Sequence, residues 1–185
     1  MKSNKLSEAC IQIYTGEGKG KTTAALGCAL RMLGIGGKVM FGQFIKGRIL
    51  SSEFNILNKF PDQFTYRSFG RGRFIKGNPS EEDLKSAAAG LIECREIIQS
   101  AEYDLIVLDE LNVAIGCGLF SVDEISEFLD FYKQEIKKSG RCTELIITGR
   151  NAPARLIDMA DLVSEIKSVK HYFQADIPAR AGIEM

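Results

Sequence analysis

The chain has 185 residues, which is enough for one buried core and too few for two ordinary domains. Its 24 Lys and Arg balance its 24 Asp and Glu, so no excess of positive charge indicates nucleic acid or an anionic membrane surface as a partner. The sequence also lacks a signal pattern and any apolar run near the roughly 20 residues of a membrane span. We therefore expect one cytoplasmic domain over residues 1–185, with residues 1–9 as a loose tail.

Apolar runs typical of buried strands recur along the chain and mostly alternate with helical patterns. They cover residues 11–14, 39–44, 64–69, 105–109, 145–148 and 162–166. Strands that alternate with helices favour right-handed crossovers and a mainly parallel sheet with helices on both faces. In such a sheet ligands bind at the carboxyl ends of the strands. The residues that follow each strand are therefore the candidates for function.

Helix starts are also readable in the sequence. Residues 22–33 predict a helix after the first strand, and two S-x-x-[DE] capping boxes begin at Ser80 and Ser121. Apolar and long side chains follow each box at helical spacing: Leu84, Ala88, Leu91, Arg95 and Ile98 after the first, and Ile125, Phe128, Leu129, Tyr132 and Ile136 after the second. Pro153 favours the first turn of a short helix that ends near Ala160.

The turn after the first strand, YTGEGKGKTTAALG, is close to the phosphate-binding pattern G-x-x-x-x-G-K-[ST]. The end of the pattern is intact at Gly20, Lys21 and Thr22. The first position holds Thr15, and the first glycine has moved to Gly16. A chance G-K-T turn is disfavoured, because three glycines and two lysines stand in six residues between a strand and a helix.

This loop predicts a nucleotide site with a role for each polar residue. Lys21 is the expected phosphate lysine, Thr22 the hydroxyl ligand of Mg²⁺, and Lys19 a second cation for the same anion. Mn²⁺ is an alternative metal. The expected nucleotide contacts in the loop are Gly16, Glu17, Gly18, Lys19, Gly20, Lys21, Thr22 and Thr23.

The stretch YDLIVLDEL ends an apolar strand in two carboxylates, Asp109 and Glu110, as a Walker-B strand does beside a metal. Side chains alternate in direction on a strand, so only one of the two is expected to face the Mg²⁺ directly. A solvated acidic turn is the alternative, which the phosphate loop disfavours. We assign Asp109, Glu110 and Thr22 to the metal, and Lys21, Thr22 and Glu110 to catalysis.

Three further positions follow predicted strands and complete the expected nucleotide site. Gln43 is a candidate for orienting either a water or the nucleotide, Lys46 reaches the triphosphate or is a solvated loop lysine, and Arg150 follows the fifth strand. The only histidine is His171, which excludes a histidine-based triad and favours a structural role for that residue. Five scattered cysteines without C-x-x-C spacing are typical of reduced thiols.

The segment FTYRSFGRGRFIKG interleaves aromatic and basic residues with glycines. Taken alone it favours a solvated basic loop at a strand edge. A flat ligand with an apolar face and a polar rim would also need such a mixture. The candidates for binding such a ligand are Phe69, Arg71, Arg73 and Phe74.

Together these motifs resemble the P-loop type of ATP:corrinoid adenosyltransferase over essentially the whole chain. The displaced glycine belongs to that family's pattern. The matching stretches are TGEGKGKTTAALGCALR, QFIKG, LIVLDEL, ITGR and DMADLVSEIKSVKHYFQADIPARAGIE. The relatives carry a Phe-x-Trp pair that faces the corrinoid; this chain has no Trp, and Phe69 or Phe74 is expected in that role.

The resemblance implies an α/β fold of the three-layer P-loop (RecA-like) type with a mainly parallel, roughly six-stranded sheet. It implies transfer of the 5′-deoxyadenosyl group of Mg-ATP to a Co(I) corrinoid with release of triphosphate, in adenosylcobalamin biosynthesis or corrinoid salvage. ATP is expected reversed in the loop, which holds the leaving group. A homodimer and a flavin-dependent reductant or flavodoxin-like protein are the implied partners.

Two other functions are compatible with a phosphate loop. A small P-loop kinase or ATPase would produce ADP, and the displaced glycine and the C-terminal match argue against it. A regulator would hold nucleotide or corrinoid without turnover. The presence of Lys21, Thr22 and the Asp109-Glu110 pair makes a regulator the weaker interpretation.

Overall fold

The computed structural model describes residues 8–45, 52–57, 59–71, 75, 77–172, 178–180 and 182–183. One sheet runs through them in the strand order β3-β2-β4-β5-β1-β6, and every neighbouring pair is parallel. The strands are β1 (Ile11–Thr15), β2 (Val39–Gln43), β3 (Phe64–Ser68), β4 (Leu105–Asp109), β5 (Glu144–Thr148) and β6 (Leu162–Glu165). All six predicted strands are present, and their ends differ from the prediction by one residue at most.

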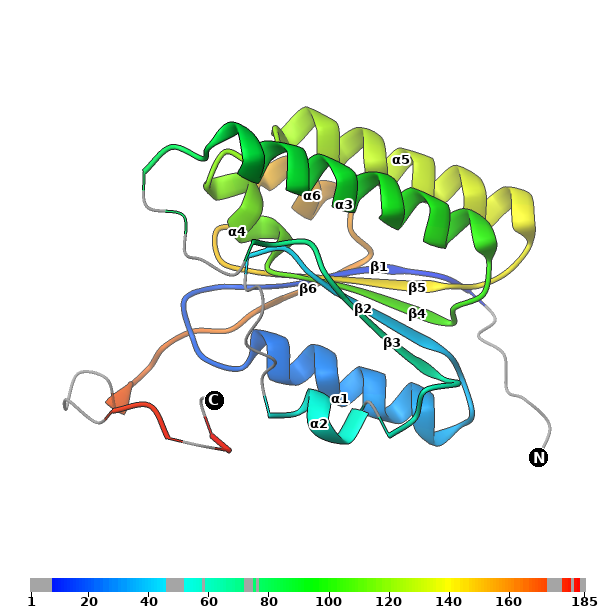
Figure 1. Cartoon of the computed structure of the whole chain (residues 1–185), viewed down its shortest axis with the longest axis horizontal. Helices are drawn as coiled ribbons and strands as arrows, with labels where there is room; N and C mark the ends of the chain where they lie inside the picture. Colours follow the sequence, from blue (N-terminus) through cyan, green and yellow to red (C-terminus); the bar gives the residue numbers. More distant parts are fainter. Residues whose placement is uncertain are drawn as a thin grey trace.

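Helices cover both faces of this sheet, so the predicted three-layer α/β arrangement is confirmed (Figure 1). One face carries α1 (Lys21–Gly34) and the short α2 (Phe54–Leu57). The opposite face carries α3 (Glu81–Ser100), α4 (Leu111–Gly116), α5 (Val122–Ser139) and α6 (Ala154–Met159). None of the helices in the described ranges is long and apolar enough to cross a membrane.

Both predicted capping boxes start helices. At α3 the Asp83 N–H donates to Ser80 Oγ at 3.3 Å, and the Ser80 N–H donates to the Asp83 carboxylate at 3.0 Å. The Ser121 and Glu124 pair repeats this exchange at α5. These bonds satisfy backbone donors that a helix N-terminus leaves unpaired, which explains why a short pattern located the helix starts correctly.

The buried face of α5 agrees with the spacing of its apolar residues, and that of α3 agrees with it only at Leu91 and Ile98. Leu84 is 40% exposed and Ala88 is also exposed, while the buried face runs instead through Asp83, Ala87, Gly90, Leu91, Cys94 and Ile98. Small residues at 87 and 90 let α3 approach the sheet closely. Large apolar side chains alone therefore do not mark the buried face of α3, because close packing there also depends on small residues.

Phe69 explains why α3 needs this small-residue face. Its ring is only 5% exposed and packs at 4.9 Å from the Phe44 ring. A Cβ added at Gly42 would lie 2.5 Å from the ring, and one at Gly90 would lie 2.6 Å from it. The ring is therefore clamped between β2 and α3. This corrects the expectation that Phe69 presents its face to a corrinoid, because its ring belongs to the core.

Phe69→Ala is expected to lower the free energy of unfolding by about 3–5 kcal/mol, because the surrounding backbone cannot collapse onto the lost ring. Denaturant unfolding measures this loss. The control is Phe60→Ala, since Phe60 is 43% exposed; its effect should stay below about 1 kcal/mol. Equal small losses for the two variants would contradict the packing described for Phe69.

Candidate nucleotide-binding site

The carboxyl ends of four strands meet where the sequence placed its candidate residues. In the sheet, β5 lies between β4 and β1, and β2 borders β4 on the other side. The phosphate loop, Asp109, Thr148 and Gln43 therefore share one edge of the sheet. The helix α1 begins directly after the loop, so its N-terminal backbone donors also face this edge (Figure 1).

Two glycines of the loop, Gly16 and Gly18, are required because the chain that leaves β6 packs against them. The Gly18 N–H donates to the Ile166 carbonyl at 2.7 Å. A Cβ at Gly16 would lie 2.5 Å from that same carbonyl oxygen, and Gly16 has a φ of +96°. A Cβ at Gly18 would lie 2.8 Å from Ile166. The displaced glycine thus stands where the loop passes against β6, and any side chain there would push the loop off the sheet.

Lys21 points back into the loop that precedes it. Its Nζ donates to the carbonyls of Gly16 at 2.7 Å and Gly18 at 2.8 Å, and the residue is buried. Burial lowers the pKa of Lys21, and the nearby Arg150 guanidinium lowers that pKa further, while neighbouring carboxylates raise it. The loop therefore encloses a cation at its centre, as an anion site requires.

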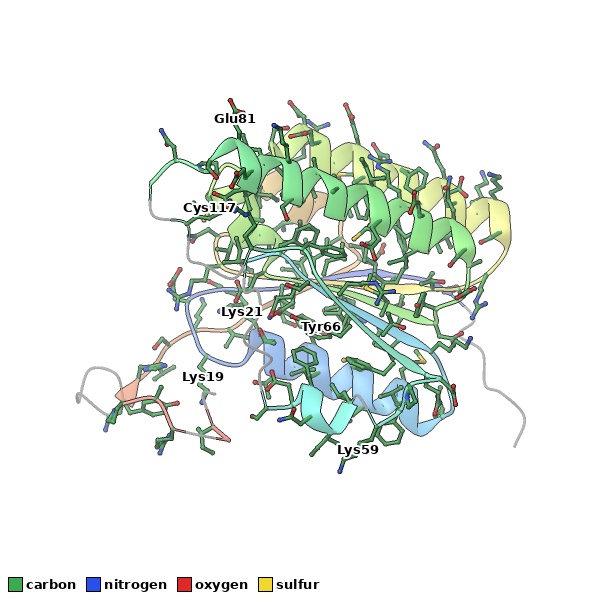
Figure 2. The ribbon with its side chains drawn as sticks, in the orientation of Figure 1. Lys19, Lys21, Lys59, Tyr66, Glu81 and Cys117 are labelled. Atoms are coloured by element: carbon green, nitrogen blue, oxygen red, sulfur yellow. The ribbon has the colours of Figure 1, made fainter. Side chains whose placement is uncertain are left out.

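Lys19 takes a different direction from Lys21. Its Nζ donates to the Tyr172 hydroxyl at 2.7 Å and to the Ile183 carbonyl at 3.1 Å, and it lies over the Tyr172 ring. Figure 2 shows Lys21 beside the sheet and Lys19 farther out, toward the C-terminal segment. The contact of Lys19 with phosphate stays a prediction. The His171 ring lies tilted against the Tyr172 ring in the same segment, with 4.7 Å between the ring centroids.

Asp109 lies at the centre of the polar residues of the site. Its carboxylate is fully buried, and Oδ1 accepts from the hydroxyls of Thr22 at 2.9 Å and Thr148 at 2.7 Å. Oδ2 accepts from Gln43 Nε2 at 2.7 Å. Of the two predicted acids, Asp109 is therefore the one in contact with the loop threonine.

Gln43 is directed toward Asp109 through its amide. The Tyr66 hydroxyl donates to Gln43 Oε1 at 3.2 Å, which assigns the amide nitrogen to the Asp109 side. Burial raises the pKa of Tyr66, so this hydroxyl keeps its proton. Tyr66 was not predicted as a site residue. Thr148, in the stretch ITGR at the end of the fifth predicted strand, was a strand-end candidate without an assigned role.

Glu110 begins α4 in the left-handed conformation, with a φ of +61°. Its backbone N–H donates to the Thr148 hydroxyl at 3.0 Å, and that hydroxyl in turn donates to Asp109. Thr148 therefore holds both residues of the acidic pair. A non-glycine residue with positive φ is uncommon and is often part of a functional site.

Arg150 and Glu17 form an ion pair at 3.2 Å between the turn after β5 and the phosphate loop. Both side chains are more than half exposed, so the pair itself contributes little stability. Its importance is geometric, because it places the guanidinium beside the loop. Thr23, also predicted to contact nucleotide, is exposed in the first turn of α1.

The predicted corrinoid residues are only partly described. Arg71 forms ion pairs with Glu82 and with Asp83, the latter at 3.8 Å, at the start of α3. Arg73 and Phe74 lie outside the described residues, and so does Lys46 of the nucleotide set. Their predicted roles stay predictions.

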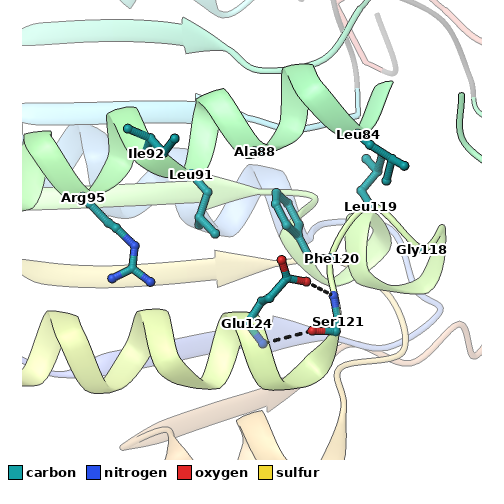
Figure 3. Close-up of a pocket in the computed structure, with 10 residues that line it drawn as sticks. All are labelled: Leu84, Ala88, Leu91, Ile92, Arg95, Gly118, Leu119, Phe120, Ser121 and Glu124. Atoms are coloured by element: carbon teal, nitrogen blue, oxygen red, sulfur yellow. Dashed lines mark hydrogen bonds between the residues drawn. The ribbon is translucent and has the colours of Figure 1, made fainter. Parts of the chain in front are cut away.

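A groove of about 410 Å³ lies between α3 and α5 and shares no residue with the strand-end site (Figure 3). Leu84, Ala88 and Ile92 of α3 line it, with Leu119 and Phe120. Arg95 borders the groove and lies over the Phe128 and Phe131 rings. This groove arises from the packing of the helices and is not part of the nucleotide site.

A glycine loop between a strand and a helix, facing a buried carboxylate at the end of another strand of a parallel sheet, defines a protein of the P-loop (RecA-like) class. The solved structure of the flagellar accessory protein FlaH from Methanocaldococcus jannaschii shares this fold. The TM-score is 0.58 over 85% of this chain and 70% of that chain, at 16% sequence identity.

Residues 7–185 match the family model described as ATP:corrinoid adenosyltransferase BtuR/CobO/CobP, and the chain belongs to this family. It is thus an enzyme, a transferase that adenosylates corrinoids using ATP. The corrinoid adenosyltransferase of Pseudomonas aeruginosa is 33% identical over 94% of this chain and 82% of its own length. Those of Escherichia coli K12 and Salmonella typhimurium are each 34% identical over 94% of this chain and 84% of their own lengths.

Gly16→Ala should abolish the loop conformation, because the new Cβ would meet the Ile166 carbonyl and the backbone has positive φ. We expect a destabilised protein that no longer binds ATP, as measured by thermal unfolding and calorimetric titration. Gly27→Ala is the matched control. It lies within α1 with open space around it, and should raise stability by about 0.5–1 kcal/mol without affecting ATP binding. Normal ATP affinity in the Gly16 variant would contradict the role assigned to β6.

Proposed function

We propose that this enzyme transfers the 5′-deoxyadenosyl group of Mg-ATP to the Co(I) centre of a corrinoid and releases intact triphosphate. The observation that carries the proposal is the loop with Lys21 at its centre, joined through Thr22 to the buried Asp109. This arrangement provides positive charge and a metal site for a polyphosphate. Reversed binding of ATP would place the triphosphate here as the leaving group.

The proposed reaction is a displacement at C5′ of ATP. The Co(I) lone pair forms the cobalt–carbon bond, the C5′–O bond breaks, and its electron pair leaves with the triphosphate oxygen. No proton transfer is needed, so the protein contributes orientation and charge stabilisation rather than a base. Lys21, with Arg150 beside the loop, would stabilise the negative charge that develops on the triphosphate.

The residues at the strand ends fit a magnesium ion. Mg²⁺ prefers oxygen ligands and is commonly held by few protein groups together with substrate phosphates. The Thr22 hydroxyl and the Asp109 carboxylate, 2.9 Å apart, are such ligands, and Glu110 follows directly in the chain. When bound, the ion would neutralise charge on the triphosphate. Mn²⁺ takes similar ligands and is the alternative metal.

The corrinoid is proposed to bind near the segment after β3. Arg71 and Arg73 would supply donors for its polar rim, and Phe74 the apolar group near cobalt, now that Phe69 belongs to the core. We further propose a homodimer in the cytoplasm, supplied with electrons by a flavin-dependent reductant or a flavodoxin-like protein. These partners rest on family resemblance.

The direct test is anaerobic incubation with Mg-ATP and a chemically reduced Co(I) corrinoid, with the cobalt spectrum and the phosphate product followed together. We expect a light-sensitive adenosylated corrinoid and one triphosphate for each transfer, because the bond that breaks lies at C5′. Production of ADP and phosphate with unchanged cobalt would instead identify a phosphate-cleaving enzyme. ATP binding without any adenosylation would favour a regulator.

The metal assignment is tested by Asp109→Asn and Glu110→Gln. Asp109→Asn should raise the Mg²⁺ concentration for half-maximal rate about tenfold or more, because it removes charge from the acid that contacts Thr22. Glu110→Gln should shift this concentration less. Asp130→Asn, at an exposed position of α5, is the control. Unchanged Mg²⁺ dependence in both site variants would refute the assignment.

A further inference from the structure

Thr15 occupies the position where the common phosphate-loop pattern has its first glycine. It is the last residue of β1 and is only 7% exposed. Its Oγ1 accepts a hydrogen bond from the Ala152 N–H at 3.1 Å. Glycine has no side-chain acceptor, so the departure from the pattern creates a link between the phosphate loop and the turn after β5.

That turn is also held at its start, by two hydrogen bonds to Gly149. The Gly149 N–H donates to the Tyr14 carbonyl at 3.2 Å, and Asn112 Nδ2 donates to the Gly149 carbonyl at 3.3 Å. Two residues of the turn have positive φ, Gly149 at +132° and Asn151 at +53°. Such a backbone persists only where surrounding contacts hold it. The Thr15 bond is the anchor at the far end of the turn.

Arg150 stands between these anchors. Its guanidinium reaches the phosphate loop, where it pairs with Glu17 at 3.2 Å. The backbone position of a long, exposed side chain sets the region that its end can reach, because the side chain itself has many rotamers. The bonds at Gly149 and Ala152 on either side of Arg150 therefore determine where its guanidinium can lie.

We propose that Thr15 is a positioning residue for triphosphate binding: its hydroxyl holds the 149–152 turn so that Arg150 lies beside the phosphate loop. This inference rests on the proposed function, because it requires the triphosphate of ATP in the loop. Thr15 itself need not touch the substrate. Its effect on binding should pass through Arg150.

The test is calorimetric titration with tripolyphosphate and with Mg-ATP of the wild type, T15V, T15S, R150A and the T15V/R150A double variant. T15V keeps the shape of the side chain and loses the acceptor, so affinity should fall about fivefold, the worth of one neutral hydrogen bond. T15S keeps the acceptor and should bind as the wild type does. In the double variant, affinity should equal that of R150A, because the turn no longer carries the cation.

A second threonine, Thr65, serves as the control that distinguishes a positioning role of Thr15 from a purely structural one. The Thr65 hydroxyl accepts from Tyr103 at 3.0 Å on β3, away from the loop, so T65V removes a comparable bond. T65V should lower the melting temperature and leave tripolyphosphate affinity unchanged, whereas T15V should change both. If T15V does not fold, Thr15→Ala provides the same comparison.

The outcomes distinguish the inference from the function on which it rests. Wild-type protein that binds neither tripolyphosphate nor Mg-ATP would contradict the proposed function and overturn the inference with it. Wild-type binding with undiminished affinity in T15V would overturn the inference alone. The same holds if T15V and R150A weaken binding additively, since Thr15 would then act independently of Arg150.

Discussion

The buried carboxylate of Asp109 is the interaction on which the site depends. A fully buried carboxylate is very costly unless its oxygens are bonded, and here three side chains bond it. Thr22 comes from α1, Gln43 from β2 and Thr148 from β5. The Asp109 carboxylate therefore joins the start of α1 to the ends of two strands. The network brings the proposed metal ligand Asp109 into contact with Thr22 of the phosphate loop before any ligand binds, which lowers the cost of ordering them.

The second constraint is the approach of β6 to the phosphate loop. Backbone contact between Gly18 and Ile166 leaves no room for side chains at Gly16 and Gly18. The glycine pattern is thus explained by a neighbouring strand as much as by phosphate. It also explains why the first glycine can move: Gly16 meets β6, while Thr15 before it is still part of β1 and can use its side chain elsewhere.

Much of the fold was predictable because its signals are local. Strands appear as short apolar runs, and the capping boxes of α3 and α5 depend on bonds across three residues. Burial was not predictable where it depends on a distant partner. Phe69 looked like a ligand-facing aromatic in a basic loop, yet Gly42 and Gly90, far apart in the chain, together make a space for its ring. No local pattern reports that space.

The sequence by itself determined the family, through the order of its motifs along the chain. It also determined the residue types of the candidate site, because few side chains can bind phosphate or a metal ion. Which of these residues meet was decided by the strand order, which places β5 between β4 and β1. That order selects Asp109 for Thr22, directs Gln43 to Asp109, and turns Lys19 toward Tyr172. Such contacts join residues up to 164 positions apart. They arise only when the sheet assembles, since pairing of distant strands is a property of the whole packed chain.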